Sequence, residues 1–345
     1  MSIRIGIDVM GGDHAPGAIL DGCIESLQHL GDSDRLVLIG PKEEIKSALI
    51  ERGLDDARIE IEHASESIPM GASPTVAVRQ MRDSSIVRMA TLGSKKAEVR
   101  CDAVISAGNT GACVAAGQMH MKRLNGVHRP GIAVTFPSFH GPVVLCDAGA
   151  NPEPRATHLW QYGIMADIYA KRVLGIENPR VGLMNIGSEE GKGSGLARET
   201  ADLLKRTSCV NYIGYIEGRD VFSGTADVIV TDGFVGNTVL KMAEGFAQSI
   251  FKAIAQEIFE HDPKLAMQFE PIVKQIYKKN DYHEYGGAPL LGVNGVMIIA
   301  HGSSEARTIT NAIRNTLEYV RGHVNDEIVE RLAQVSEIEQ GEPAS

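Results

Sequence analysis

The chain has 345 residues, a formal net charge of −10 and a hydrophobic fraction of 43%. This length can build a large core, and the acidic balance excludes nucleic acid as the main partner, because binding phosphate backbones needs a basic face. No apolar run approaches the length of a membrane span, and the five cysteines, without C-x-x-C spacing and mostly in apolar runs, predict buried reduced thiols.

The first sixty residues alternate between short apolar runs and helical patterns. Strands are expected at 4–9, 36–39 and 58–62, with helices at 17–30 and 42–52 between them. This βαβαβ order predicts parallel strands with helices on both faces of the sheet. Because the first strand begins at once, no signal peptide is expected.

The loop after the first strand carries four candidate substrate-binding residues, Gly11, Gly12, Asp13 and His14. Adjacent glycines allow the backbone to approach a ligand closely or to adopt positive φ. Open α/β sheets bind ligands at the carboxyl ends of their strands, where Asp13 and His14 are expected. A capped turn without function is the alternative.

A second loop of this kind follows the strand expected at 103–105. It contains Ser106, Gly108, Asn109 and Thr110, and its polar donors between glycines favour an anion such as phosphate over a plain turn.

A helix expected at 76–82 places Arg79 and Arg82 one turn apart. These two arginines form either a small basic patch on the rim of a site or an ordinary solvated face.

The middle of the chain predicts an antiparallel hairpin, with strands at 132–136 and 143–146, inside the parallel pattern. Asp147 and Asn151 follow in a third polar loop and are candidate substrate-binding residues. No strand here carries a dinucleotide fingerprint, so a dinucleotide site is unsupported.

The strand expected at 181–186 leads to a loop with Glu189 and Lys192, which departs from a phosphate-binding Walker loop in its spacing. Glu189 is a candidate substrate-binding residue. Lys192 lies between glycines, where it could stabilise an anionic transition state, or it is a flexible surface lysine.

The stretch from Asp227 to Lys241 predicts a buried strand at 228–230, a tight loop, and a helix opening at Gly236 and Asn237. That helix N-terminus would present N–H groups to an anion, with Asp232 and Asn237 beside it. The alternative is an ordinary turn with Asn237 as the N-cap.

The chain then predicts a hydrophobic helical hairpin over 243–280, with helices to His261 and from Leu265 to Tyr277 around Pro263. It packs against a partner subunit, lies in a membrane surface, or is a core helix pair.

A strand at 295–300 leads to His301 and Ser303, both candidate substrate-binding residues, and to a last helix at 305–325. Residues 1–338 are expected to form one α/β unit and 339–345 a disordered tail.

These loops should meet at one edge of the sheet, because parallel strands end together. The cleft so formed has many amides and neutral donors, with neither a Ser-His-Asp order nor a metal-ligand spacing. It is therefore expected to bind an oxyanion rather than to supply a covalent nucleophile.

The loop motifs together resemble those of the phosphate acyltransferase of bacterial phospholipid synthesis, in order from Ile3 to Val320. The matching segments are Asp8–Asp13, Ser106–Ala112, Asp147–Asn151, Asn185–Gly193, Thr231–Asn237 and His301–Ser303. The sequence departs from the family pattern at Leu92–Arg100, which is longer and more charged, and at Gly193–Gly195, which is richer in glycine.

The resemblance implies an α/β fold with a doubly wound, mostly parallel sheet in a three-layer αβα sandwich. Such a fold resembles isocitrate and isopropylmalate dehydrogenases and phosphate acetyltransferases, here with a protruding helical hairpin. It also implies a cytoplasmic homodimer in peripheral contact with the membrane, close to the downstream glycerol-3-phosphate acyltransferase.

The implied reaction transfers a long fatty acyl chain from acyl carrier protein to inorganic phosphate, without a cofactor or metal. Phosphate would rest at Asn109 and Thr110 and attack the thioester directly, and Lys192, Asn237 and Asp232 are the expected catalytic residues, with Gly236 binding substrate. A short-chain enzyme using coenzyme A, a dehydrogenase on the same fold, and a non-catalytic scaffold for the carrier are the alternatives.

Overall fold

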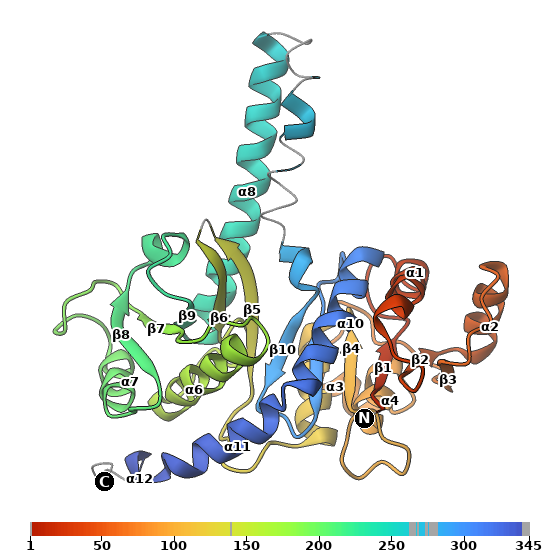
Figure 1. Cartoon of the computed structure of the whole chain (residues 1–345), viewed down its shortest axis with the longest axis horizontal. Coiled ribbons are helices and arrows are strands. Elements are labelled where there is room, and N and C mark those ends of the chain that lie inside the picture. Colours follow the sequence, from red (N-terminus) through yellow and green to blue (C-terminus); the bar gives the residue numbers. More distant parts are fainter. Residues whose placement is uncertain are drawn as a thin grey trace.

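The computed structural model describes residues 2–138, 140–261, 267, 269–272, 275 and 282–339. Within these residues, eleven strands form one sheet in the order β3-β2-β1-β4-β11-β10-β5-β6-β9-β7-β8 (Figure 1). The strands are β1 (Arg4–Asp8), β2 (Arg35–Gly40), β3 (Ile59–His63), β4 (Ala103–Ser106), β5 (Gly131–Ser138), β6 (Gly141–Cys146), β7 (Arg180–Met184), β8 (Asn211–Ile216), β9 (Val228–Val230), β10 (Ala288–Leu291) and β11 (Val296–Ile299).

The helices alternate with these strands along most of the chain. They are α1 (Gly17–Ser26), α2 (Lys42–Glu51), α3 (Pro74–Gln80), α4 (Ser85–Leu92), α5 (Thr110–Ala116), α6 (Ala156–Arg172), α7 (Gly195–Lys205), α8 (Gly233–His261), α10 (Ala306–Arg321), α11 (Val324–Gln334) and α12 (Ser336–Glu339). A short 3-10 helix, η4 (Tyr282–Tyr285), precedes β10.

Alternating side chains along the central strands divide the core into two faces. In β4, Ala103 and Ile105 pack with α1, α6 and α10, whereas Val104 packs with α3, α4 and α5. Residues of β11 alternate in the same way, as the period of two in a strand requires. The result is the predicted three-layer αβα sandwich with a mostly parallel sheet, since seven of its ten strand pairings are parallel.

The two halves of the sheet run in opposite directions, contrary to the expectation that all strands end at one edge. The reversal comes from three successive antiparallel pairings, β11 with β10, β10 with β5, and β5 with β6. The hairpin of β5 and β6 was predicted, but the additional strand β10 was not.

A stagger between the halves nevertheless brings both sets of carboxyl ends to the same level. Ile299, at the end of β11, pairs with Ala288 of β10. The register of β10 on β5 places Ala288 level with Val134. At the end of β6, Cys146 pairs with Ala133, the next residue of β5. One residue of a strand spans about 3.3 Å, so the loops after both halves converge over β10 and β5.

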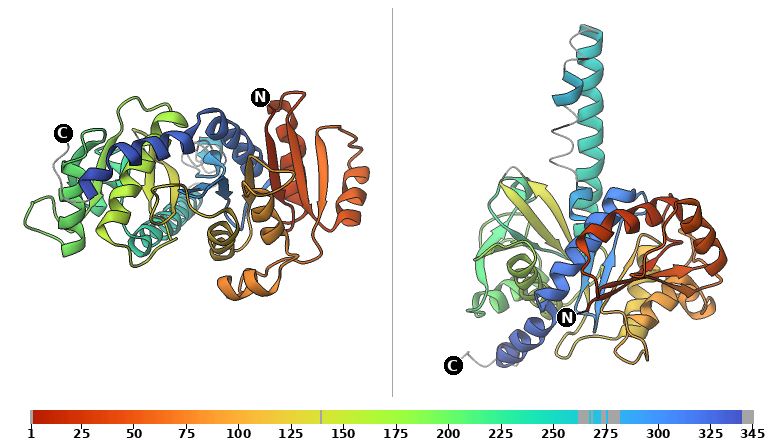
Figure 2. Two further views of the ribbon diagram at one scale, coloured as in Figure 1. Left: turned by 90° about the horizontal axis from the view of Figure 1, so that it is seen from below. Right: turned by 45° about the vertical axis from the view of Figure 1, so that its right-hand side comes forward.

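The helix α8 begins at Gly233 rather than at Asn237 and runs for 29 residues. It projects from the body of the molecule, as Figure 1 and the right-hand view of Figure 2 show. The second helix expected at 265–277 lies mostly outside the described residues, and so does almost all of the tail at 339–345. The extents of a single unit at 1–338 and of the hairpin at 243–280 remain predictions.

Other predicted elements differ from the structure near their ends. The last helix was expected to be continuous over 305–325, but it stops at Arg321, and α11 begins at Val324 after a left-handed His323. All five cysteines are free thiols, and all except Cys209 are buried, as predicted. Within the described ranges, no helix is both long and apolar enough to cross a bilayer.

Candidate active site

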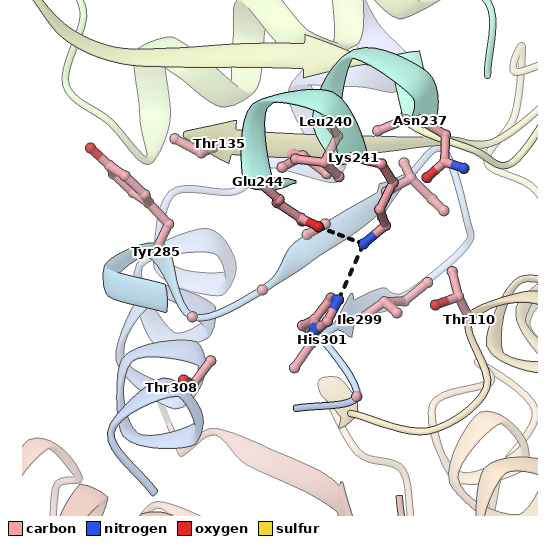
Figure 3. A pocket seen from close by; sticks show the side chains of 18 of the residues that line it. Thr110, Thr135, Asn237, Leu240, Lys241, Glu244, Tyr285, Ile299, His301 and Thr308 are labelled. Atoms are coloured by element: carbon pink, nitrogen blue, oxygen red, sulfur yellow. Dashed lines mark hydrogen bonds and ion pairs between the residues drawn. The ribbon is translucent and has the colours of Figure 1, made fainter. Parts of the chain in front are cut away.

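A cavity of about 270 Å³ lies over the central strands, where the loops of the two halves converge (Figure 3). Its wall is largely apolar, and its polar lining comes from several separate segments of the chain. The apolar lining includes Met70, Ile132, Val134, Ala148, Leu240, Ile299 and Ala300. The polar lining includes Asp13, Thr110, Asn237, Lys241, Glu244 and His301.

Lys241 is the centre of the polar side of this cavity. Its Nζ lies 2.8 Å from Oε2 of Glu244 and 3.2 Å from Nε2 of His301 (Figure 3). His301 Nδ1 lies in turn 2.8 Å from Oγ of Ser303. An ammonium group has three N–H donors, so two are engaged here and one is left for a substrate.

Sequence reasoning missed Lys241 and Glu244, although a signal for Lys241 was present. Lys241 follows Asn237 by four residues, so the two side chains share one face of α8.

The β4–α5 loop uses most of its predicted site residues to support the fold. Ser106 is buried and donates to Asp8 Oδ2 at 2.7 Å, while its Oγ accepts the N–H of Gly108. Burial raises the pKa of Asp8, and hydrogen bonds from neighbouring serines oppose the rise. Gly11 packs against this cluster, because a Cβ at Gly11 would lie 2.6 Å from Gly108 N.

Asn109 is the N-cap of α5 and also holds the preceding loop. Its Oδ1 accepts the N–H of Ala112, and its Nδ2 donates to the carbonyls of Pro69, Met70 and Ala72. The side chain of Asn109 is thereby occupied, so Thr110 is the member of this loop that faces the cavity.

Asp147 and Asn151 are also buried and saturated with hydrogen bonds. Asp147 Oδ1 accepts the N–H groups of Ile132 and Ala150, and its Oδ2 accepts that of Asn151. Burial raises the pKa of Asp147, and these backbone N–H groups oppose the rise. Asn151 O accepts the N–H of Gly233, so this pair joins the β6–α6 loop to the start of α8.

The start of α8 corrects the expected helix N-terminus at Gly236 and Asn237. Asp232 precedes the helix, and its Oδ1 accepts the N–H of Val235 at 2.9 Å, as an N-cap side chain does. The N–H of Gly236 is bonded to Asp232 O, so it does not face an anion. Asn237 is therefore within the helix, where its exposed side chain lines the cavity.

The β7–α7 loop, with Lys192, and the start of α8, with Asn237, were expected to form one catalytic site, but they do not share the cavity. Lys192 and Glu189 do not line the cavity; they lie in the β7–α7 loop and pair with each other at 2.7 Å. Both side chains are more than half exposed. The catalytic role of Lys192 stays a prediction.

The β1–α1 and β11–α10 loops meet beside the cavity. The N–H of Asp13 donates to Gly302 O at 2.7 Å, and a Cβ at Gly12, whose φ is +105°, would lie 2.9 Å from the same oxygen. Asp13 and His301 line the cavity, whereas His14, although exposed, does not. Among the described residues, no cluster of three or more His, Cys, Asp or Glu side chains could hold a metal ion.

Comparison with solved structures confirms the fold class. A phosphotransacetylase from Streptococcus pyogenes has a TM-score of 0.62 at 15% identity, covering 93% of this chain and 94% of that one. A 4-hydroxythreonine-4-phosphate dehydrogenase from Klebsiella pneumoniae has a TM-score of 0.50 at 15% identity, covering 92% of this chain and 99% of that one. At these identities the likeness concerns the fold alone.

Comparison at the level of sequence reaches further. Residues 3–327 match the family model described as "Fatty acid synthesis protein". A phosphate acyltransferase from Geotalea daltonii is 43% identical over 335 residues, which cover 96% of this chain and 94% of that protein. With identity at this level across both chains, the protein belongs to the phosphate acyltransferase family of enzymes.

Proposed function

We propose that this enzyme transfers a long-chain fatty acyl group from the thioester of acyl carrier protein to inorganic phosphate, releasing acyl phosphate. The observation that carries the proposal is a single cavity with an apolar wall and one lysine at its polar side. An acyl chain is held by apolar surface, and phosphate is attracted by a cation and hydrogen-bond donors.

The proposed step forms one bond and breaks one bond. A phosphate oxygen attacks the thioester carbonyl carbon, and collapse of the tetrahedral intermediate breaks the C–S bond. The electron pair leaves with sulfur, and the carrier thiolate takes a proton from solvent. A thiol has a pKa near 8.5, so it departs with little acid assistance.

Five side chains divide the remaining tasks. Lys241 uses its third N–H to hold phosphate and the oxyanion of the intermediate, while Glu244 fixes the ammonium group in place. Thr110 and Asn237 line the same cavity and donate hydrogen bonds to the substrate. His301 lies between Lys241 and Ser303: its Nε2 contacts Lys241 Nζ, and its Nδ1 contacts the hydroxyl and the N–H of Ser303.

The proposed reaction is tested directly with purified enzyme, acyl carrier protein charged with a C16 chain, and inorganic phosphate. Acyl phosphate is trapped as the hydroxamate, and the freed carrier thiol is measured in parallel. Equal amounts of both products, formed only when phosphate is present and without nucleotide or metal, are expected. Thiol release that is independent of phosphate would contradict the proposal.

A short-chain reaction with coenzyme A is the second candidate, because one of the solved structures of similar fold is a phosphotransacetylase. A parallel assay with acetyl coenzyme A separates the two. The largely apolar wall favours the C16 donor, so a higher kcat/KM for acetyl coenzyme A would reverse the assignment.

We also propose that α8 pairs with α8 of a second subunit and that its far end contacts lipid. Large apolar side chains are exposed along the whole helix, including Met242 (69%), Phe246 (72%), Ile250, Ile254 and Phe259 (61%). A monomer would leave this surface in water, which soluble proteins avoid over large patches. The acyl phosphate would then leave beside the membrane, where a glycerol-3-phosphate acyltransferase consumes it.

The proposed subunit contact and the proposed lipid contact lie at different positions along α8, so substitutions can test them separately. Phe246→Asp with Ile250→Asp should produce a monomer in sedimentation experiments, and Phe259→Glu should reduce liposome co-sedimentation without dissociating the dimer. A dimer that survives the first pair of changes would place the subunit contact elsewhere. Unchanged liposome binding by Phe259→Glu would remove the far end of α8 as the lipid contact.

A further inference from the structure

The outer side of α3 combines exposed apolar and cationic side chains next to the cavity. The inner face of α3 buries Ala77 and Val78. Val76, which is 49% exposed, and Arg79, one turn later, therefore lie together on the outer face. Two further residues extend this surface, and the four together, called the α3 rim, are Met70, Val76, Arg79 and Arg82. Met70 is itself 50% exposed.

The α3 rim is continuous with the cavity. Met70 belongs to both, and Asn109 Nδ2 fixes its loop by donating to Met70 O at 2.8 Å. Pro74, the first residue of α3, packs directly on Gly111, where a Cβ would lie 2.5 Å from Pro74 Cγ. Gly111 follows the cavity residue Thr110, and seven helical residues span only about 10 Å.

The charges of the α3 rim are available to a partner. Neither Arg79 nor Arg82 forms an ion pair with a carboxylate in the described part of the chain; Arg82 Nε only donates to Arg79 O at 3.4 Å. The nearby Asp83 is engaged by Ser65 and by Arg88, and these contacts lower its pKa. The whole chain carries −10, so an acidic protein approaches only where a local basic patch attracts it.

We propose that the α3 rim docks the protein that carries the acyl thioester, through an acidic helix with apolar residues on the same face. This inference rests on the proposed function and identifies the surface of this enzyme that the acyl carrier protein contacts. Arg79 and Arg82 meet the carboxylates, while Val76 and Met70 meet the apolar residues. The prosthetic arm then enters past Met70, and the thioester arrives between Thr110 and Lys241.

A second basic cluster provides a matched control. Arg123, Arg129 and Arg155 surround His158, with Lys122 nearby, but none of the large exposed apolar side chains lies in this cluster. Charge alone would favour this cluster equally, whereas a mixed acidic and apolar helix fits only the α3 rim.

The test compares Arg79→Glu/Arg82→Glu with Arg123→Glu/Arg129→Glu, each with C16-acyl carrier protein and with C16-acyl pantetheine. The α3 rim variant should lose at least tenfold in kcat/KM for the carrier substrate and keep its activity with acyl pantetheine. The control variant should keep both activities. Arg79→Lys/Arg82→Lys should retain most of the carrier activity, and carrier charge reversal from acidic to basic should restore the Glu variant.

Direct binding of the carrier, measured by fluorescence anisotropy at two salt concentrations, separates this inference from the proposed function. Weaker binding by the α3 rim variant alone supports the docking surface, even if wild-type enzyme forms no acyl phosphate. The docking surface would be overturned if the α3 rim variant bound the carrier as wild type does, or if only the Arg123/Arg129 variant lost binding. An equal loss of activity with acyl pantetheine would also overturn it. Equal urea midpoints of all variants exclude unfolding as the cause.

Discussion

The polar loops of this enzyme are of two kinds that look alike in sequence. In the β4–α5 and β6–α6 loops, Asn109 and Asp147 are buried and every side-chain oxygen and nitrogen binds backbone groups. On α8 and after β11, Lys241 and His301 are exposed and line the cavity, and Lys241 contacts the side chains of Glu244 and His301 rather than buried backbone groups. A polar residue beside glycine therefore either supports the site or acts in it, and its hydrogen-bond saturation distinguishes the two.

The largest expected effect concerns a residue that supports the site. Asp147→Ala would leave the N–H groups of Ile132, Ala150 and Asn151 without their acceptor in a buried place. Each unsatisfied group costs about 1–3 kcal/mol, so the free energy of unfolding should fall by about 4 kcal/mol. Urea unfolding followed by circular dichroism measures this loss.

Asp13→Ala is the matched control, since Asp13 is an exposed aspartate that lines the cavity directly. Its free energy of unfolding should change by less than about 0.5 kcal/mol. A similar loss in both variants would remove the distinction between the two kinds of loop.

The order of the elements and the fold class were largely predictable from sequence, because local periodicity determines both. The direction of the second half of the sheet was not predicted, because β10 is only four residues long and was missed, although Asn294 and Gly295 between β10 and β11 are a hairpin turn signal. The residues of the cavity were predictable only in part. Asp13, Thr110, Asn237 and His301 were identified, but burial of Asn109 and Asp147 depends on contacts across the whole chain.

The next effect concerns turnover rather than stability. Lys241→Ala should raise the barrier to acyl phosphate formation by about 2–4 kcal/mol, because a donor to the developing oxyanion is lost from the cavity. Asn237→Ala should have an effect of the same order, and neither variant should change the urea midpoint. The measurement is kcat/KM for C16-acyl carrier protein at saturating phosphate.

Lys192→Ala belongs in the same experiment, because sequence reasoning assigned the catalytic cation to Lys192. Its exposed pairing with Glu189 in the structure predicts a smaller loss than that of Lys241→Ala. Wild-type turnover by Lys241→Ala, with a large loss in Lys192→Ala, would return the role to Lys192 and imply that the β7–α7 loop moves to the cavity.

A smaller effect is expected from Thr110, which tests where phosphate binds. Thr110→Val keeps the side-chain shape and removes one hydroxyl donor from the cavity. The loss of one hydrogen bond to a charged ligand should raise the KM for phosphate about tenfold, equivalent to about 1.4 kcal/mol, with little change in the KM for the acyl donor. An effect confined to the acyl donor would place phosphate at another part of the cavity.

The smallest expected effect is the pH dependence contributed by His158. Burial, together with the positive charges of His128, Arg129, Arg155 and Arg123, lowers the pKa of His158 from 6.5 to about 4. The neutral ring also accepts the N–H of Arg155 at Nδ1, a bond that protonation removes. The unfolded chain binds a proton at pH 6.5 and the folded chain does not, so this contribution to stability is complete above pH 6.5 and is lost as the pH falls toward 4. Because the side chain is partly exposed, solvent screening should limit the change to about 1 kcal/mol.

Urea unfolding of wild type and His158→Gln from pH 7.5 to pH 4 should show wild type losing more stability over this window, with a constant difference below it. Parallel curves for the two proteins would show that His158 does not titrate differently in the folded and unfolded chains.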